Sequence, residues 1–310
     1  MQPRPVYIRL LIHLLLAAFL ANAANKFFVR DLEYEAEHHF YERIFDFRGD
    51  APDQYRIVPL LPLKVLTTQL SFNYAVLLYN ALLGFLAFEL FYLLMAGFRE
   101  THKYAVAVLF AVLYIFFQYT GWRPDTMGLL VVCAGSMALA QRRFAGPLHE
   151  LVLVISVALL TFCRADIALV YGLMFAAGYT RSWPVRTLLV LLPLAGQFAL
   201  QSYIFPEAAY YSQKLMLGDN LRFYYLLRHP ATYLILAVGL IWWGAIRSFL
   251  RLTFRKYLRV YLLLSGYIFL VLFIGRLNEY RLYLPFLPIF LAMASDTYNY
   301  SKHEKGARAV

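Results

Sequence analysis

The sequence has little charge and almost no thiol. Only 15% of its 310 residues are charged, whereas about a quarter is usual in a soluble domain. Its two cysteines, Cys133 and Cys163, lie in or beside apolar stretches, which argues against a disulfide scaffold and a thiolate metal site. Hydrophobic residues make up 62% and the mean hydropathy is +0.58. This apolar content exceeds the needs of one globular core, so most of it is expected to face lipid or neighbouring helices.

The motifs of soluble nucleotide chemistry are also missing. The chain has no Walker loop, dinucleotide-binding glycine motif, nucleophile elbow or HExxH pattern. His38 and His39 adjoin three glutamates, but their spacing matches no strong metal motif. Chemistry on cytosolic nucleotides is therefore not supported, and no protein-bound metal is assigned.

Ten apolar stretches predict an all-α, polytopic transmembrane bundle that forms a single domain over residues 1–310. The stretches are 10–25, 75–98, 104–119, 126–140, 151–162, 167–179, 187–204, 231–246, 260–274 and 282–294. The larger connections are a first loop, 26–64, and a second, 205–230. Both are expected on the same side of the membrane.

The basic residues are distributed unevenly between the two sides of this bundle. Segments on the N-terminal side carry 16 of the 29 Lys and Arg with 4 acids, while the opposite segments carry 13 bases and 13 acids. The positive-inside rule then places both termini in the cytoplasm, and the net charge of +11 reflects topology rather than nucleic-acid binding. Residues 1–23 resemble a cleavable signal peptide, but ten spans favour an uncleaved first helix.

Several outer turns place arginine close to a carboxylate. They are Arg123-Pro124-Asp125, Arg164-Ala165-Asp166 and Arg276-Leu277-Asn278-Glu279-Tyr280-Arg281. The helices beside Arg164 and Asp166 have only about 12–13 apolar residues, or ~20 Å, so this pair should lie below the outer membrane surface. Buried charges need partners or a watered cavity. The turns are either separate helix caps or the lining of one shared cavity, and their number on one side favours the cavity.

The first outer loop offers acids beside this cavity. An amphipathic segment over residues 40–47 is expected to lie at the membrane interface. A turn follows that presents Asp50 and Asp53, with Arg56 nearby. Either acid could serve as general base toward a hydroxyl group, unless the loop is simply a solvated acidic face. The second loop adds Arg222 among several tyrosines.

These features resemble the GT-C superfamily of polytopic membrane glycosyltransferases. In that family the first helix starts in the cytoplasm, and the first outer loop carries an interfacial helix and a catalytic acid. Later outer loops supply arginine and carboxylate to a cavity for a polyprenyl-phosphate-linked sugar. The likeness covers nearly the whole chain in topology. This chain is shorter than many members, lacks a periplasmic domain and has no adjacent acidic pair in the first loop.

The resemblance implies transfer of a sugar from a lipid-phosphate donor to a hydroxyl acceptor on a glycan, lipid or protein, outside a bacterial inner membrane. Asp50 or Asp53 would be the base. Substrate-binding residues would be Arg56, Arg123, Asp125, Arg164, Asp166, Arg222, Arg276, Glu279 and Arg281. No cofactor is required, and a divalent metal is compatible with the reaction but not demanded by it.

Two other functions use the same residues. A transporter or flippase for an anionic or lipid-linked substrate would be expected to show repeated halves, broken helices near the midplane and polar groups on the inner side. A noncatalytic membrane scaffold would leave the Arg–carboxylate pairs scattered as helix caps. The clustering of polar groups on the outer side favours the enzyme.

Overall fold

A computed structural model describes residues 6–30, 41–46, 48–49, 53–118, 124–208, 233, 236–237, 239–240, 243–274 and 282–307. Every regular element within these ranges is a helix, which confirms the all-α prediction. The main helices are α1 (Val6–Arg30), α3 (Ile57–Thr67), α4 (Phe72–Leu94), α5 (Glu100–Gln118), α6 (Pro124–Arg142), α7 (Pro147–Thr161), α8 (Ala165–Gly178), α9 (Trp183–Ala199), α13 (Trp243–Thr253), α14 (Leu258–Ile274) and α15 (Leu287–Ala307). Short helical turns are η1 (Asp53–Tyr55), η2 (Leu200–Ile204) and η4 (Leu284–Phe286).

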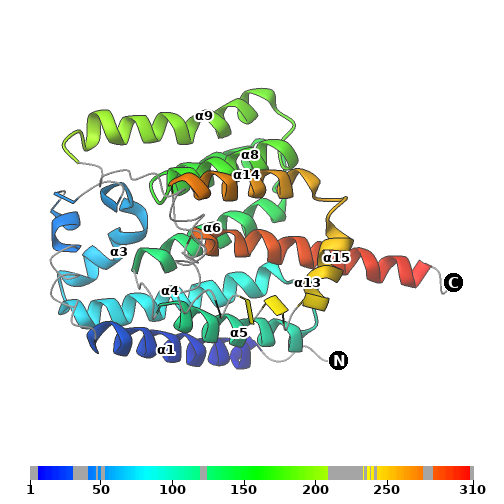
Figure 1. The fold of residues 1–310 in the computed structure, drawn as a ribbon, viewed down its shortest axis with the longest axis horizontal. Coiled ribbons are helices and arrows are strands. Elements are labelled where there is room, and N and C mark those ends of the chain that lie inside the picture. The colour runs from blue at the N-terminus through cyan, green and yellow to red at the C-terminus, as the bar shows by residue number, and fades with distance from the viewer. Residues whose placement is uncertain are drawn as a thin grey trace.

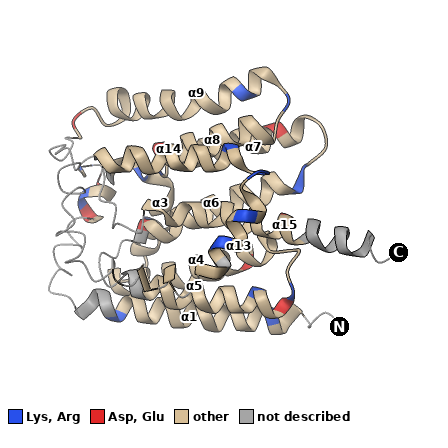
Figure 2. Cartoon of the chain, turned by 45° about the vertical axis from the view of Figure 1, so that its right-hand side comes forward, with Lys and Arg blue, Asp and Glu red and all other residues tan. Residues whose placement is uncertain are grey.

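The long helices run side by side along one direction (Figure 1). At one end of the bundle, α1 begins and α15 ends. Lys and Arg gather there (Figure 2), and we call it the basic end. The helix bounds place four arginines at this end: Arg9 in the first turn of α1, Arg143 directly after α6, Arg181 between α8 and α9, and Arg259 in the first turn of α14. The opposite end holds η1 and the turn between α7 and α8, and we call it the loop end. The predicted difference in charge between the two sides of the membrane stays a prediction, because many charged residues of the loop end lie outside the described ranges.

Three of the described helical segments are long and apolar enough to cross a membrane: Val6–Lys26, Phe72–Leu94 and Trp183–Ile204. Shorter apolar helices lie at Ile57–Thr67, Pro147–Thr161, Ala165–Gly178 and Leu258–Phe273. Each of the ten predicted stretches overlaps a helix, although 231–246 is described only in part and overlaps α13 only at 243–246. Ten membrane crossings, and the cytoplasmic side of the termini, stay predictions.

The bundle core joins helices that are distant in the sequence. One buried cluster includes Ala17 of α1, Phe88 of α4, Phe110 of α5 and Tyr171 of α8. Small residues allow close approach where α1 crosses α4, because a Cβ at Gly84 would lie 3.5 Å from the Cβ of Ala17. The core fixes the helices that carry the charged turns at the loop end.

The first loop differs from its predicted form. The sequence placed a single loop over 26–64, but α1 continues to Arg30 and α3 begins at Ile57. Within the expected interfacial segment, Tyr41 and Ile44 are buried against α1, α3 and α4 instead of facing lipid. Their apolar side chains find a protein core because α3 folds back beside α4.

Candidate functional site

The first charged pair at the loop end joins the first loop to α6. Arg56 precedes α3, and its Nη1 donates to Oδ2 of Asp125 at 2.7 Å. Both side chains are largely buried, so the pairing offsets the cost of burying each charge. The other oxygen of Asp125, Oδ1, is buried and accepts no hydrogen bond from the described residues. This oxygen is an available acceptor for a hydroxyl group.

The second pair lies at the turn between α7 and α8. Arg164 caps α8, and its Nε and Nη2 donate to the two carboxylate oxygens of Asp166 at 2.9 and 2.6 Å. This two-bond geometry fixes the plane of the guanidinium. Nη2 also donates to the hydroxyl of Tyr267 at 3.0 Å, and that hydroxyl lies 3.0 Å from Oδ2 of Asp166. Three groups from two helices therefore hold one another in place.

A backbone contact brings the two pairs together. The N–H of Val58 donates to the carbonyl of Phe162 at 3.2 Å. Arg56 and Arg164 each lie two residues from this bond. The structure thus brings together two Arg–carboxylate pairs from three parts of the chain.

The helix lengths bear on how deep these charges lie. With 15 residues in α7 and 14 in α8, each helix extends about 21–23 Å at 1.5 Å per residue, short of the ~30 Å hydrocarbon layer. Tyr267 lies seven residues before the end of α14, about 10 Å from that end. In a membrane-embedded bundle, the Arg164 pair would therefore lie below the surface at the loop end.

Other contacts tie α8 and α14 to the segment that follows residue 281. The hydroxyl of Tyr171 donates to the carbonyl of Pro285 at 2.7 Å. The ring of Tyr267 packs edge-on against Phe286 at 4.8 Å between centroids. Phe286 is thereby held against Tyr267, the residue whose hydroxyl bonds to Arg164.

The predicted site residues divide into two groups. Arg56, Asp125, Arg164 and Asp166 are brought together, and the sequence had linked Asp125 with Arg123 where the structure shows a bond to Arg56. Asp53 lies in η1, directly before this site, but its side chain is not described. The residues outside the described ranges are Asp50, Arg123, Arg222, Arg276, Glu279 and Arg281.

One member of the site could not be predicted from the sequence. Tyr267 lies within the predicted apolar stretch 260–274, where a tyrosine is expected to be a packed or interfacial side chain. Its position next to a charged turn about a hundred residues earlier is set by tertiary packing. No local pattern marked it.

The described residues hold no group of three or more His, Cys, Asp or Glu side chains arranged to bind a metal ion. Cys133 and Cys163 are both buried and free. His38 and His39 lie outside the described ranges. The chemistry of the described site is therefore that of guanidinium, carboxylate and phenol.

Comparison of the chain with protein-family models, with curated proteins and with solved structures finds no match.

Proposed function

We propose that the protein is a membrane-embedded glycosyltransferase that moves a sugar from a lipid-phosphate donor to a hydroxyl acceptor at the loop end. The observation that carries this proposal is the backbone bond from Val58 to Phe162, which joins two partly buried Arg–carboxylate pairs from distant turns. In a noncatalytic scaffold, each Arg–carboxylate pair would cap its own helices, and the two pairs would have no reason to lie together. The loop end would face the outside, and the basic end the cytoplasm.

The arginines would hold the phosphate of the donor. Asp166 and Tyr267 occupy Nε and Nη2 of Arg164, and its Nη1 forms no bond to a described residue. Nη1 is therefore available to a phosphate oxygen while the rest of the guanidinium is already oriented. A preoriented cation of this kind stabilises negative charge on the leaving phosphate without reorganisation.

The transfer itself needs a base and a leaving group. The acceptor oxygen would form a bond to the anomeric carbon as the bond from that carbon to the phosphate oxygen breaks. The phosphate would leave with the electron pair, and Asp50 or Asp53 would take the acceptor proton. Oδ1 of Asp125 would accept a hydrogen bond from a sugar hydroxyl. A divalent metal is compatible with this reaction but is not required for it.

The test is sugar transfer in reconstituted vesicles. Purified protein is given radiolabelled sugars on polyprenyl phosphate, and labelled acceptor is separated from donor. Wild type is compared with Asp50→Asn, Asp53→Asn and Arg164→Lys, which keeps the charge but loses the two-bond geometry. Arg181→Lys is the matched control, since Arg181 is exposed in the turn between α8 and α9, at the basic end.

The expected result is transfer by wild type and by Arg181→Lys, with a loss of at least about a hundredfold in Arg164→Lys and in one aspartate variant. Failure of the intact protein with every donor would overturn the proposal. Movement of labelled lipid between leaflets without transfer would instead show a flippase.

A further inference from the structure

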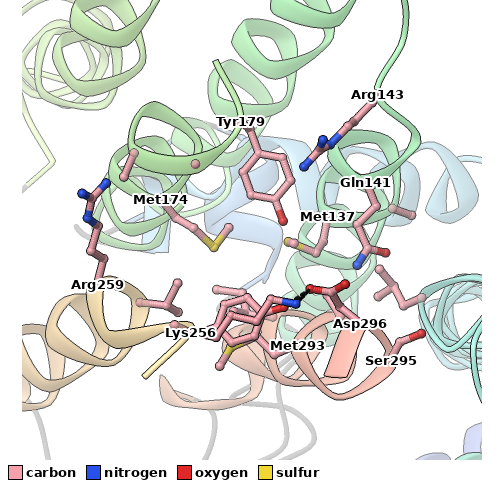
Figure 3. Close-up of a pocket in the computed structure, with 18 of the residues that line it drawn as sticks. Met137, Gln141, Arg143, Met174, Tyr179, Lys256, Arg259, Met293, Ser295 and Asp296 are labelled. Atoms are coloured by element: carbon pink, nitrogen blue, oxygen red, sulfur yellow. Dashed lines mark hydrogen bonds and ion pairs between the residues drawn. The ribbon is translucent and has the colours of Figure 1, made fainter. Parts of the chain in front are cut away.

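A second feature lies at the basic end, away from the proposed transfer site. A cavity of about 1120 Å³ opens there between α4, α6, α8, α14 and α15. Figure 3 shows basic side chains and methionines facing the same space. Its lining combines a charged rim with an apolar floor.

The rim carries a net positive charge. Five bases line the cavity: Arg142, Arg143, Arg255, Lys256 and Arg259. The acid of the lining, Asp296, is already paired, because Lys256 contacts it at 2.7 Å and the hydroxyl of Tyr257 donates to it. The four arginines make no ion pair or hydrogen bond through their side chains to any other described residue. Four guanidinium groups are thus free to bind an anion.

The floor is apolar and adaptable. Met137, Met174 and Met293 come from three different helices and face the cavity in Figure 3. Methionine side chains are flexible and fit irregular apolar shapes. Tyr179 points its hydroxyl between them (Figure 3), and a phenol can donate a hydrogen bond there without adding charge. The ligand that matches this lining has an anionic head and an apolar tail.

The backbone conformation of Arg143 is strained, which lowers the stability of the folded protein. Arg143 directly follows α6 with a φ of 46°, in the left-handed region. Glycine is the usual residue at such a helix end, because side chains are strained in this conformation. The conformation directs Arg143 toward the cavity (Figure 3). A strained residue that faces a cavity suggests a ligand-binding role.

The neighbouring helix α13 suits the surface of a membrane. Its apolar residues Trp243, Ile246 and Leu250 are exposed, and Arg247 and Arg251 lie on the same short helix. Exposed apolar side chains beside arginines are typical of a helix that lies in the lipid headgroup region. The chain continues from α13 through Arg255 and Lys256 into the rim of the cavity. The rim is therefore expected at headgroup level.

We propose that this cavity binds one anionic phospholipid of the adjoining leaflet. The arginines of the rim, Arg143 and Arg259 among them, bind its phosphate, and its acyl chains cover the methionine-lined floor. Basic pockets between membrane helices on the cytoplasmic side are suited to anionic headgroups. The binding site is independent of sugar transfer, since it lies at the opposite end of the bundle.

The test measures lipid binding to the full-length protein. The protein is purified in a neutral detergent and titrated with short-chain phosphatidylglycerol or phosphatidylcholine, and adducts are counted by native mass spectrometry. We expect one phosphatidylglycerol to be retained in preference to phosphatidylcholine. Arg143→Gln with Arg259→Gln should weaken its binding by about 25-fold, since each basic side chain contributes about fivefold near an anionic headgroup.

Two further variants separate the pocket from general surface charge. Arg99→Gln with Arg181→Gln removes two exposed charges from the basic end without touching the cavity, and should leave binding unchanged. Ala177→Phe places bulk at an exposed position of the lining, and should weaken lipid binding while leaving the charges intact. Thermal unfolding without lipid checks that each variant is folded.

The proposal fails if the Arg99 and Arg181 variant loses as much affinity as the pocket variant, because the effect is then general electrostatics. It also fails if phosphatidylcholine binds as well as phosphatidylglycerol. Inorganic phosphate at millimolar concentration should displace little lipid, and full displacement would show a site for free phosphate instead.

Discussion

His13 on α1 and Glu89 on α4 lie 76 positions apart in the sequence, and their side chains meet at 2.7 Å. Arg9, one turn before His13, contacts the other oxygen of Glu89 at 3.2 Å. His13 is 1% exposed, as expected for a packed, hydrogen-bonded histidine. Glu89, a carboxylate within an apolar helix, thus contacts both Arg9 and His13 of α1. These contacts hold α1 against α4 near the basic end.

Removal of this carboxylate should loosen the first helix. Glu89→Gln leaves Arg9 without its counter-charge, so we expect a loss of about 1–2 kcal/mol in the free energy of unfolding. Thermal or denaturant unfolding in detergent measures it. Glu207→Gln is the control, because Glu207 is exposed at the other end. Equal stability of the two variants would show that the pairing contributes nothing.

Close packing of α8 against α9 gives a second prediction. A Cβ at Gly172 would overlap the backbone carbonyl oxygen of Leu189, whereas one at Gly178 on the same helix meets nothing within 4 Å. Gly172→Ala should therefore separate α8 from α9 and cost about 2 kcal/mol or more. Gly178→Ala should be neutral or slightly stabilising. Matching unfolding curves for the two variants would contradict the close contact between these helices.

The hydroxyl of Tyr267 is expected to position Arg164. Tyr267→Phe removes one bond to Arg164 and one to Asp166 and keeps the ring that packs against Phe286. We expect a modest loss of stability, about 1 kcal/mol. If the transfer reaction holds, the KM for the lipid-phosphate donor should rise several-fold more than the KM for the acceptor.

A merely structural role would lower the amount of folded enzyme without moving either KM. Tyr203→Phe serves as the control, since Tyr203 is an exposed tyrosine in η2. Equal changes in both KM values, or in neither, would remove Tyr267 from the site.

The pair formed by Arg56 and Asp125 can be tested by a double-mutant cycle. Arg56→Met or Asp125→Leu alone removes one member of this largely buried ion pair, at a cost of about 3 kcal/mol. The double variant should lose less than the sum of the two, because neither charge remains. Unfolding in detergent measures all four proteins. Strict additivity would show that the two side chains do not interact.

Local patterns predicted part of this structure. The apolar stretches predicted the helices. The spacing of two residues between Arg164 and Asp166 predicted that their side chains would pair. The partner of Asp125 did not follow, because Arg56 lies 69 positions away and is placed by the packing of α3 on α6. Tyr267 was missed for the same reason. The burial of Tyr41 and Ile44 depends on the fold of α3, which apolar periodicity alone does not place.

The strained backbone of Arg143 makes stability and lipid binding respond in opposite directions. Arg143→Gly relieves the left-handed conformation at the end of α6 and should raise the free energy of unfolding by up to about 1 kcal/mol, or the midpoint by about 1–2 °C. The same change removes a guanidinium from the cavity, so phosphatidylglycerol should bind about fivefold more weakly.

Arg142→Gly is the matched control, because it removes the neighbouring charge of the same rim but places glycine in the last helical residue. That variant should lose stability by up to about 1 kcal/mol. If Arg143→Gly instead destabilised the protein, or bound the lipid as tightly as wild type, Arg143 would not be held in its strained conformation for the sake of the ligand.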